Sequence, residues 1–352
     1  MRPNLTWGSL QRLCGRGPFL QEKRGREMER KSLDGERRAL NAGGFRHPME
    51  RLLLGICMVG SVVLFAALLL VAFNSQTVLS FFREESIAAY REESPEAADL
   101  SDEEVIALLP PETTELLARI ESLNPVAILL GPLAVLLLTV WAMGREYGKL
   151  RANALRITAR QFPQVYAMWA SITRDLGMKK VPDLYTINGD GVLNAYAACV
   201  PGFRSFGALY SDILETCLRN EDWDSLKFIL GHEAAHIRLG HVAWWYMLFK
   251  FVFTFPPFNY IIGLPLGRAQ EYSCDKVGHA FAHDHDCKGL LMLTVGKHLY
   301  REIDFDAHME ETVERGGLWA TLVNLSSGHP ILAWRVNAIR KGHNGGLFLR
   351  RK

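Results

Sequence analysis

The stretch Leu230-Gly231-His232-Glu233-Ala234-Ala235-His236 sets the interpretation of this 352-residue chain. In a helix, two histidines four residues apart lie on one face, so both imidazoles can reach a single metal ion. Glu233 lies beside them, where its carboxylate can take a proton from a metal-bound water. By chance, this pattern should occur only about 0.02 times in such a chain. We therefore predict a helix over residues 221–242 that holds one Zn²⁺.

A catalytic zinc site needs a third protein ligand and keeps a further position open for water. Glu271 is the best candidate, because it follows His236 by 35 residues in a second predicted helix. Asp275 lies one turn later and could accept the free N–H of a ligand histidine. The alternative ligands are Cys274, His279, His283 and His285.

The segment before the zinc helix alternates turn residues with short apolar runs. We predict that these runs are strands and that one helix precedes and another follows them. The second helix opens with Asp212 and Glu215, whose spacing is that of a capping box. The predicted strands are 181–187, 193–200 and 206–210, and the predicted helices are 162–176 and one starting at 212. Residues 146–345 are thus expected to form an α+β domain, mostly helical with a small β-sheet.

Two apolar stretches closer to the N-terminus are long enough to cross a bilayer. Residues 52–73 carry no charge and would span about 33 Å as a helix. Residues 126–143 are also free of charge, at the short end of the spanning range. We predict two transmembrane helices here, within residues 49–145; buried core helices are the alternative.

The charges that flank these stretches predict their orientation. Residues 1–51 carry 12 Lys and Arg, whereas residues 74–125 carry three. The positive-inside rule places the N-terminus and the 146–345 domain in the cytoplasm, and the acidic loop 74–125 outside. In that loop we expect a helix capped by Ser101 and a second one over 112–123. Residues 1–48 are Gly-, Arg- and Glu-rich, which predicts a disordered basic tail unless the chain starts at Met49.

Four motifs together resemble those of the HtpX and CAAX prenyl endopeptidase family of membrane-anchored gluzincin metallopeptidases. They are Asn194-Ala195-Tyr196-Ala197, the 230–236 stretch with His241 trailing it, Glu271 to Asp275 with Cys274 in place of Ala, and His329-Pro330 followed by Arg335. The resemblance covers residues 150–340. It implies a zincin-like metalloprotease domain, preceded by two transmembrane helices, in which His232, His236 and Glu271 bind zinc and Glu233 is the general base.

The resemblance also implies roles for the remaining motifs. The strand formed by Asn194, Ala195, Tyr196 and Ala197 would line the cleft and pair with an extended substrate. His329 or Arg335 would stabilise the developing oxyanion, although both could equally hold the fold together.

Residues 242–266 depart from the HtpX pattern, in which two membrane spans usually lie at this point. Two crossings need roughly 40 residues and a turn, and only 25 are present. A single crossing would separate Glu271 from the histidines. We predict a short helix, a kink at Pro256-Pro257, and an apolar segment that lies in the membrane interface or dips into the bilayer and returns. A core hairpin of the soluble domain is the alternative.

These observations predict a zinc-dependent endopeptidase that is a multi-pass membrane protein. Its partners would be the lipid bilayer and a polypeptide substrate, which it would cleave at the cytoplasmic face of the membrane. The family resemblance implies that its substrates are membrane or misfolded proteins, as in protein quality control; nothing in this sequence builds the multi-span chamber of prenyl-protein enzymes. The alternatives are a catalytically inactive membrane scaffold that retains the zincin fold, and a hydrolase of non-peptide substrates. The net charge of +2 gives no indication of nucleic acid binding, and six cysteines without a CxxC pair argue against a Cys-based zinc finger.

Overall fold

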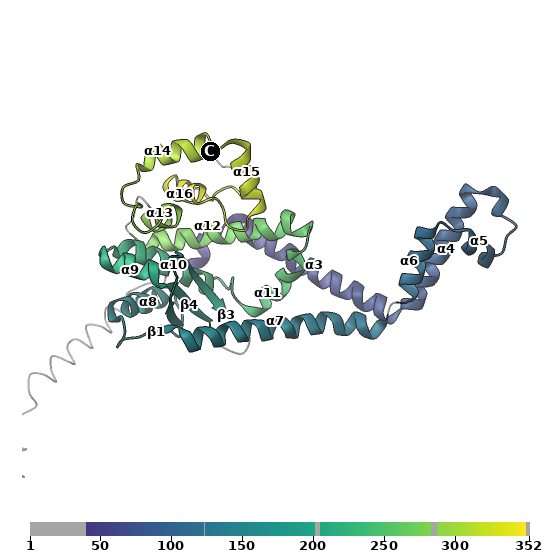
Figure 1. Cartoon of the computed structure of the whole chain (residues 1–352), viewed down its shortest axis with the longest axis horizontal. Coiled ribbons are helices and arrows are strands. Elements are labelled where there is room, and N and C mark those ends of the chain that lie inside the picture. Colours follow the sequence, from purple (N-terminus) through teal and green to yellow (C-terminus); the bar gives the residue numbers. More distant parts are fainter. Residues whose placement is uncertain (1–39, 123, 201–204, 283–286, 350–352) are drawn as a thin grey trace, which may run out of the picture.

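A computed structural model describes residues 40–122, 124–200, 205–282 and 287–349. Two long helices, α3 (Pro48–Phe73) and α7 (Pro125–Asn153), join an α+β body at one end of the molecule to a small helical unit at the other (Figure 1). Both helices are long and apolar enough to cross a membrane. Only 11% of the apolar window of α3 and none of that of α7 is buried, so neither is a core helix of the body.

The small helical unit contains α4 (Ser75–Glu93), α5 (Asp102–Leu108) and α6 (Pro111–Glu121). The predicted cap of α5 is confirmed, because Ser101 N–H donates to the Glu104 carboxylate at 2.9 Å and the Ser101 hydroxyl accepts from Glu104 N–H. The three helices pack through small apolar clusters of their own.

The body contains a four-stranded sheet, one strand more than the sequence predicts. Its order is β1-β2-β4-β3; β2 and β4 are parallel, and the outer strands are antiparallel to their neighbours. The strands are β1 (Leu155–Ile157), β2 (Asp183–Ile187), β3 (Ala195–Cys199) and β4 (Ser205–Tyr210). The three predicted strands are present, and β3 forms one edge of the sheet.

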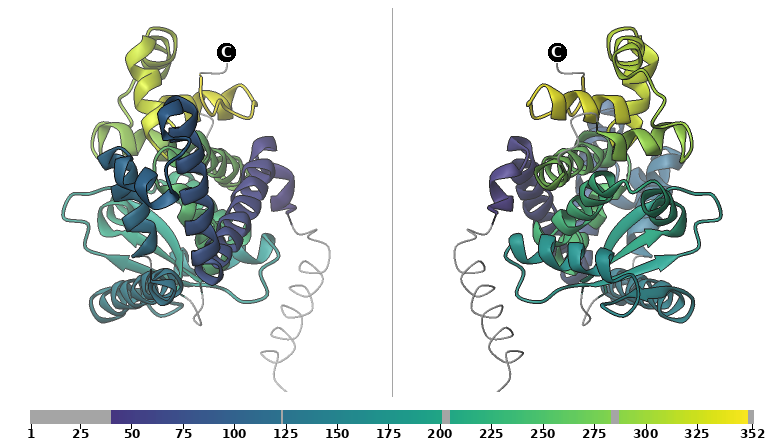
Figure 2. Two further views of the ribbon diagram at one scale, coloured as in Figure 1. Left: turned by 90° about the vertical axis from the view of Figure 1, so that its right-hand side faces the viewer. Right: turned by 90° about the vertical axis from the view of Figure 1, so that its left-hand side faces the viewer.

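Helices α10 and α12 lie between this sheet and the C-terminal helices (Figures 1 and 2). Glycines let the two helices approach closely: a Cβ on Gly278 would lie 2.7 Å from the carbonyl oxygen of Phe228, and one on Gly231 would lie 3.1 Å from Cα of Gly278. The helices of the body are α8 (Pro163–Asp175), α9 (Ser211–Arg219), α10 (Trp223–Arg238), α11 (Trp244–Phe251), α12 (Leu264–Phe281), α13 (Lys288–Val295), α14 (Phe305–Met309), α15 (Gly317–Ser326) and α16 (Leu332–Arg340).

Two expectations from the sequence are wrong. α9 has no capping box, because Asp212 lies inside its first turn and instead accepts from Gly191 N–H at 3.2 Å and pairs with Lys297 at 2.6 Å. Residues 40–48 are not disordered. They form a short 3₁₀ helix, η1 (Ala42–Phe45), with Ala42 buried, and His47 N–H donates to the Ser273 hydroxyl of α12 at 2.9 Å. The rest of the predicted tail, residues 1–39, lies outside the described residues.

Candidate metal centre

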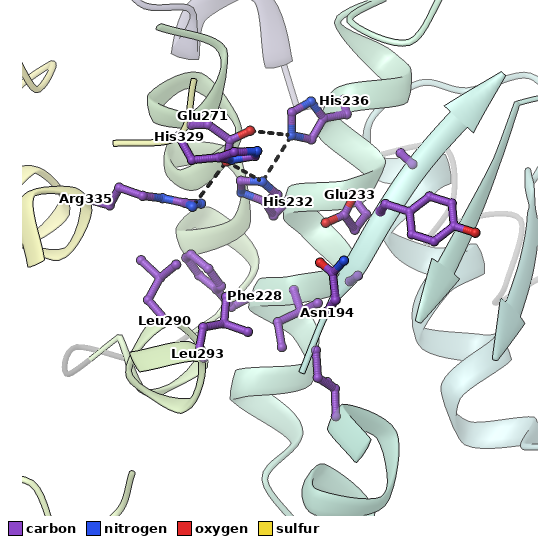
Figure 3. Close-up of a pocket in the computed structure, with 16 residues that line it drawn as sticks. Asn194, Phe228, His232, Glu233, His236, Glu271, Leu290, Leu293, His329 and Arg335 are labelled. Atoms are coloured by element: carbon purple, nitrogen blue, oxygen red, sulfur yellow. Dashed lines mark hydrogen bonds and ion pairs between the residues drawn. The ribbon is translucent and has the colours of Figure 1, made fainter. Parts of the chain in front are cut away.

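Two helices hold the three predicted ligands face to face. α10 carries His232 and His236 one turn apart, and α12 carries Glu271 opposite them (Figure 3). Nε2 of His232 lies 3.1 Å from Nε2 of His236. The Glu271 carboxylate lies 3.5 Å from the first nitrogen and 3.4 Å from the second. All three ligand atoms lie within 4.8 Å of one another, close enough to share one metal ion.

The alternative ligands are arranged differently. Cys274 belongs to a second group close enough to share an ion, with His236 and His241, and its sulfur lies 3.5 Å from Nδ1 of His241. Burial raises the pKa of the Cys274 thiol well above its usual value, which keeps it protonated. Within the described residues, His279 belongs to neither group of side chains close enough to share an ion. His283 and His285 lie outside the described residues.

The contacts around His232 fit a bound cation. Its Nδ1 lies 3.0 Å from Oδ1 of the buried Asp275, which favours a proton on Nδ1. With the proton there, the Nε2 lone pair faces the Glu271 carboxylate and the second histidine, so three electron-pair donors converge. Such a set of two imidazoles and one carboxylate suits Zn²⁺, and a cation would offset their mutual repulsion.

Arg335 of α16 fixes both carboxylates of α12. Its Nε and Nη2 donate to Asp275 at 2.7 and 2.6 Å, and its Nη1 lies 3.2 Å from Glu271. Burial alone would raise the pKa of Asp275, but the guanidinium and the His232 contact outweigh it and lower that pKa. The same guanidinium contributes to the low pKa of Glu271. Both groups are therefore held as carboxylates.

His329 approaches the same carboxylate from the open side. Its Nδ1 lies 3.2 Å from Glu271, while 75% of its side chain is exposed. His329 lies three residues after the end of α15, and its backbone N–H donates to the Ser327 hydroxyl at 3.1 Å. Of the two candidates for the oxyanion role, His329 is thus the accessible one, whereas Arg335 is 5% exposed and already paired.

A cavity of about 300 Å³ opens beside the ligands. Glu233 lies in its wall, 8% exposed, and burial is the main cause that raises the pKa of its carboxyl group (Figure 3). The cavity also has an apolar side, formed by Ile213, Phe228, Ile229, Leu290 and Leu293. A general base and an apolar recess therefore lie on one cavity.

The residues 194–197 line this cavity from the sheet. Asn194 precedes β3, and its carbonyl oxygen accepts from Tyr210 N–H of β4 at 3.0 Å. Among the described strands, β3 has a neighbour only on its β4 side, because the sheet order ends at β3. The open edge of β3 thus borders the ligand cluster.

Comparison with known families agrees with this arrangement. Residues 159–343, more than half of the chain, match the model of peptidase family M48. The chain belongs to peptidase family M48. This family contains metallopeptidases that are generally zinc-dependent. Neither the search of curated proteins nor that of solved structures gave a match. The narrower resemblance to the HtpX and CAAX enzymes stays a prediction.

A second set of contacts in this M48 domain reaches His236 from behind. Nδ1 of His236 lies 3.2 Å from Nδ1 of His241, and Nε2 of His241 lies 3.0 Å from the Glu50 carboxylate in the first turn of α3. Glu50 is fully buried, accepts from the Ser273 hydroxyl at 2.5 Å and pairs with Arg46. We refer to Glu50, His241 and His236 as the Glu50 relay.

The relay favours the metal-binding form of His236. Burial lowers the pKa of His241 to about 4, so its ring is neutral and carries one proton. With that proton donated to Glu50, Nδ1 of His241 is an acceptor for Nδ1–H of His236. Nε2 of His236 is then free to bind a metal ion. Glu50 is not predictable from the sequence, because it is 191 residues from His241 and resembles an ordinary charge flanking an apolar stretch.

Proposed function

We propose that this M48 chain is a zinc-dependent endopeptidase that cleaves polypeptides at the cytoplasmic face of a membrane. One observation carries the proposal: two histidines, a carboxylate and a buried glutamate converge on a cavity that borders a sheet edge. His232, His236 and Glu271 would bind the zinc ion, and Glu233 would be the catalytic base. An inactive scaffold would have no need for that base.

The chemistry follows from these positions. Zinc bound by the three side chains would supply Lewis-acid activation of water and of the scissile carbonyl group. Glu233 takes the proton of the attacking water and later passes it to the leaving amine. Its raised pKa makes it a stronger base than an exposed glutamate. His329, accessible beside Glu271, donates to the developing oxyanion, whereas Arg335 holds Asp275 and Glu271 in place.

An extended substrate would add to the open edge of β3. Main-chain hydrogen bonds to residues 195–197 would orient it, and the small side chains of Ala195 and Ala197 leave room for a close approach. A side chain of the substrate would then enter the apolar recess around Phe228 and Leu293. This arrangement favours unfolded or extended segments with an apolar residue near the scissile bond.

The membrane location rests on helix composition and charge. α3 and α7 are the two candidate spans, and basic residues are concentrated before α3 and after the apolar part of α7. These features support a cytoplasmic peptidase domain and an external helical unit. Substrates would then be cytoplasmic segments of membrane proteins or misfolded chains close to the membrane.

The test compares the wild type with Glu233→Gln and with Glu215→Gln, a matched change on the exposed face of α9. Each protein is purified in detergent, its zinc content is measured, and cleavage of casein is followed with and without a chelator. We expect about one zinc ion in each protein, and chelator-sensitive cleavage by the wild type and Glu215→Gln alone. Cleavage by Glu233→Gln would remove that residue as the base. Zinc without cleavage in any protein would favour the scaffold.

A further inference from the structure

The apolar insertion between the ligand helices starts and ends on the same side of the molecule. It joins α10, which carries the two histidines, to α12, which carries Glu271. It contains α11 (Trp244–Phe251), the 3₁₀ turn η3 (Val252–Thr254) and the π turn η4 (Asn259–Gly263). Because both ends are fixed at the metal centre, the insertion can leave the body only as a hairpin.

This hairpin packs along α3, well beyond the first turns of that helix. The Ser61 hydroxyl donates to the carbonyl oxygen of Phe249 at 2.8 Å. That carbonyl is among the last four of α11, which lack partners within the helix. A Cβ on Gly60 would lie 2.6 Å from the ring of Phe253, so the glycine is what lets this ring lie against α3.

The position of these contacts gives the depth of the hairpin. Leu52 is the first residue of the charge-free stretch of α3. At about 1.5 Å per residue, Ser61 lies about 14 Å further along the helix axis. The hydrocarbon core of a bilayer is about 30 Å thick. If α3 spans the membrane, the hairpin meets it close to the bilayer midplane.

The hairpin has one face for the protein and one for an apolar solvent. Its inner face is buried, with Tyr246 and Phe253 packed in a cluster with Leu53, Cys57 and Leu266. Lys250 is the only charged residue between positions 244 and 263, and it is half-buried. The large side chains of the outer face are apolar or aromatic and 39–59% exposed: Trp244, Trp245, Met247, Leu248, Phe251, Phe255, Phe258, Tyr260 and Ile261.

We propose that residues 244–263 form a re-entrant hairpin that enters the bilayer from the cytoplasmic side beside α3. The occupant of its outer face is lipid hydrocarbon. This inference rests on the proposed membrane span of α3. A face of this size without charge is costly in water, whereas helical turns with a side-chain hydroxyl on a free carbonyl suit hydrocarbon.

The hairpin has a consequence for the peptidase. It is attached to both ligand helices, with Trp244 three residues after His241 and Gly263 eight residues before Glu271. Immersion of the hairpin therefore holds the ligand cluster at the membrane surface. Substrate segments that emerge from the bilayer would meet the cleft before they could fold.

The test measures depth in the full chain, reconstituted in phosphatidylcholine nanodiscs. A fluorescent unnatural amino acid replaces Phe255 of the hairpin, exposed Val62 of α3 or exposed Lys180 of the body, one at a time. Quenching is then compared for lipids with a mid-chain nitroxide and for aqueous iodide. We expect the lipid nitroxide to quench at Phe255 about as strongly as at Val62 and several-fold more than at Lys180, with the reverse order for iodide.

Each other outcome has a defined meaning. Lipid quenching at Val62 with iodide quenching at Phe255 would overturn the re-entrant hairpin and leave the span intact. Protection of Phe255 from both quenchers would also overturn it, because protein and not lipid would then cover the outer face. Absence of lipid quenching at Val62 would refute the span itself, and the hairpin with it, while the casein assay in detergent would be unaffected.

Discussion

Replacing Asp275 with asparagine should weaken zinc binding, because it changes the proton position on a ligand histidine. The carboxylate lies 3.0 Å from Nδ1 of His232 and accepts two hydrogen bonds from Arg335 at 2.6 and 2.7 Å. An asparagine has one acceptor oxygen and one donor group. If the oxygen stays with Arg335, the amide N–H₂ faces Nδ1 of His232 and favours the tautomer whose Nε2 carries the proton. That tautomer cannot bind zinc through Nε2 until the proton leaves this nitrogen.

The size of the expected loss in zinc affinity follows from what a carboxylate does behind a ligand histidine. Loss of a carboxylate behind a ligand histidine weakens metal binding by about 10–100-fold, or about 1.4–2.7 kcal/mol. The same change also leaves the buried charge of Arg335 less well compensated, which costs up to about 3–5 kcal/mol of stability. The assay must therefore separate zinc affinity from folding. We would measure affinity by competition with a fluorescent chelator, and folding by thermal unfolding of the zinc-free protein.

The Arg335→Met variant separates the effect on zinc affinity from the effect on folding. It also destabilises the fold, yet it leaves the Asp275 contact to His232 and removes a cation that competes with zinc for Glu271. Its zinc affinity should fall less than that of Asp275→Asn. Asp306→Asn removes an exposed carboxylate of α14 that pairs with Arg340 of α16. It should change neither the zinc affinity nor the unfolding temperature. Wild-type affinity in a folded Asp275→Asn protein would refute the tautomer argument.

Three further changes test the surroundings of the site. Glu50→Gln should weaken zinc binding by about tenfold or less in the chelator assay, since it acts on the ligand only through the Glu50 relay. Gly278→Ala should cost about 1–3 kcal/mol and lower the unfolding temperature, because its Cβ would meet a backbone oxygen at 2.7 Å; Gly144→Ala, with no atom within 4 Å, should not. Arg268→Met should cost about 2–4 kcal/mol, because this fully buried side chain donates to four backbone carbonyls. The exposed Arg340→Met is its control, expected below about 1 kcal/mol.

The sequence predicts the ligand helix well because the relevant geometry is local. The spacing of His232 and His236 places both rings on one face of any helix, whatever surrounds it. The third ligand comes from another helix, so spacing can only rank the candidates. Cys274 and Glu271 are three residues apart on α12, and only the packing of α12 on α10 turns Glu271 to the histidines and Cys274 to His241.

The features that the sequence analysis missed depend on contacts between distant segments. β1 has only three residues, too few to show the alternation of a strand, and it forms through pairing with β2. Asp212 fits a capping pattern, yet its carboxylate is taken by Lys297 and a turn N–H. Residues 40–48 resemble a polar tail because their partners, such as Ser273, lie more than 200 residues away.

These distant contacts tie α3, the first candidate membrane span, to the metal centre. Leu53 and Cys57 of α3 pack in one cluster with α12 residues such as Tyr272, one residue after Glu271. Glu50, in the first turn of the same helix, ends the Glu50 relay to His236. The N-terminal half of α3 is thus packed against the ligand helices. A peptidase fragment starting at residue 146 would lack both the relay carboxylate and this packing. Its metal centre would be less well ordered for that reason, even with every ligand and Glu233 present.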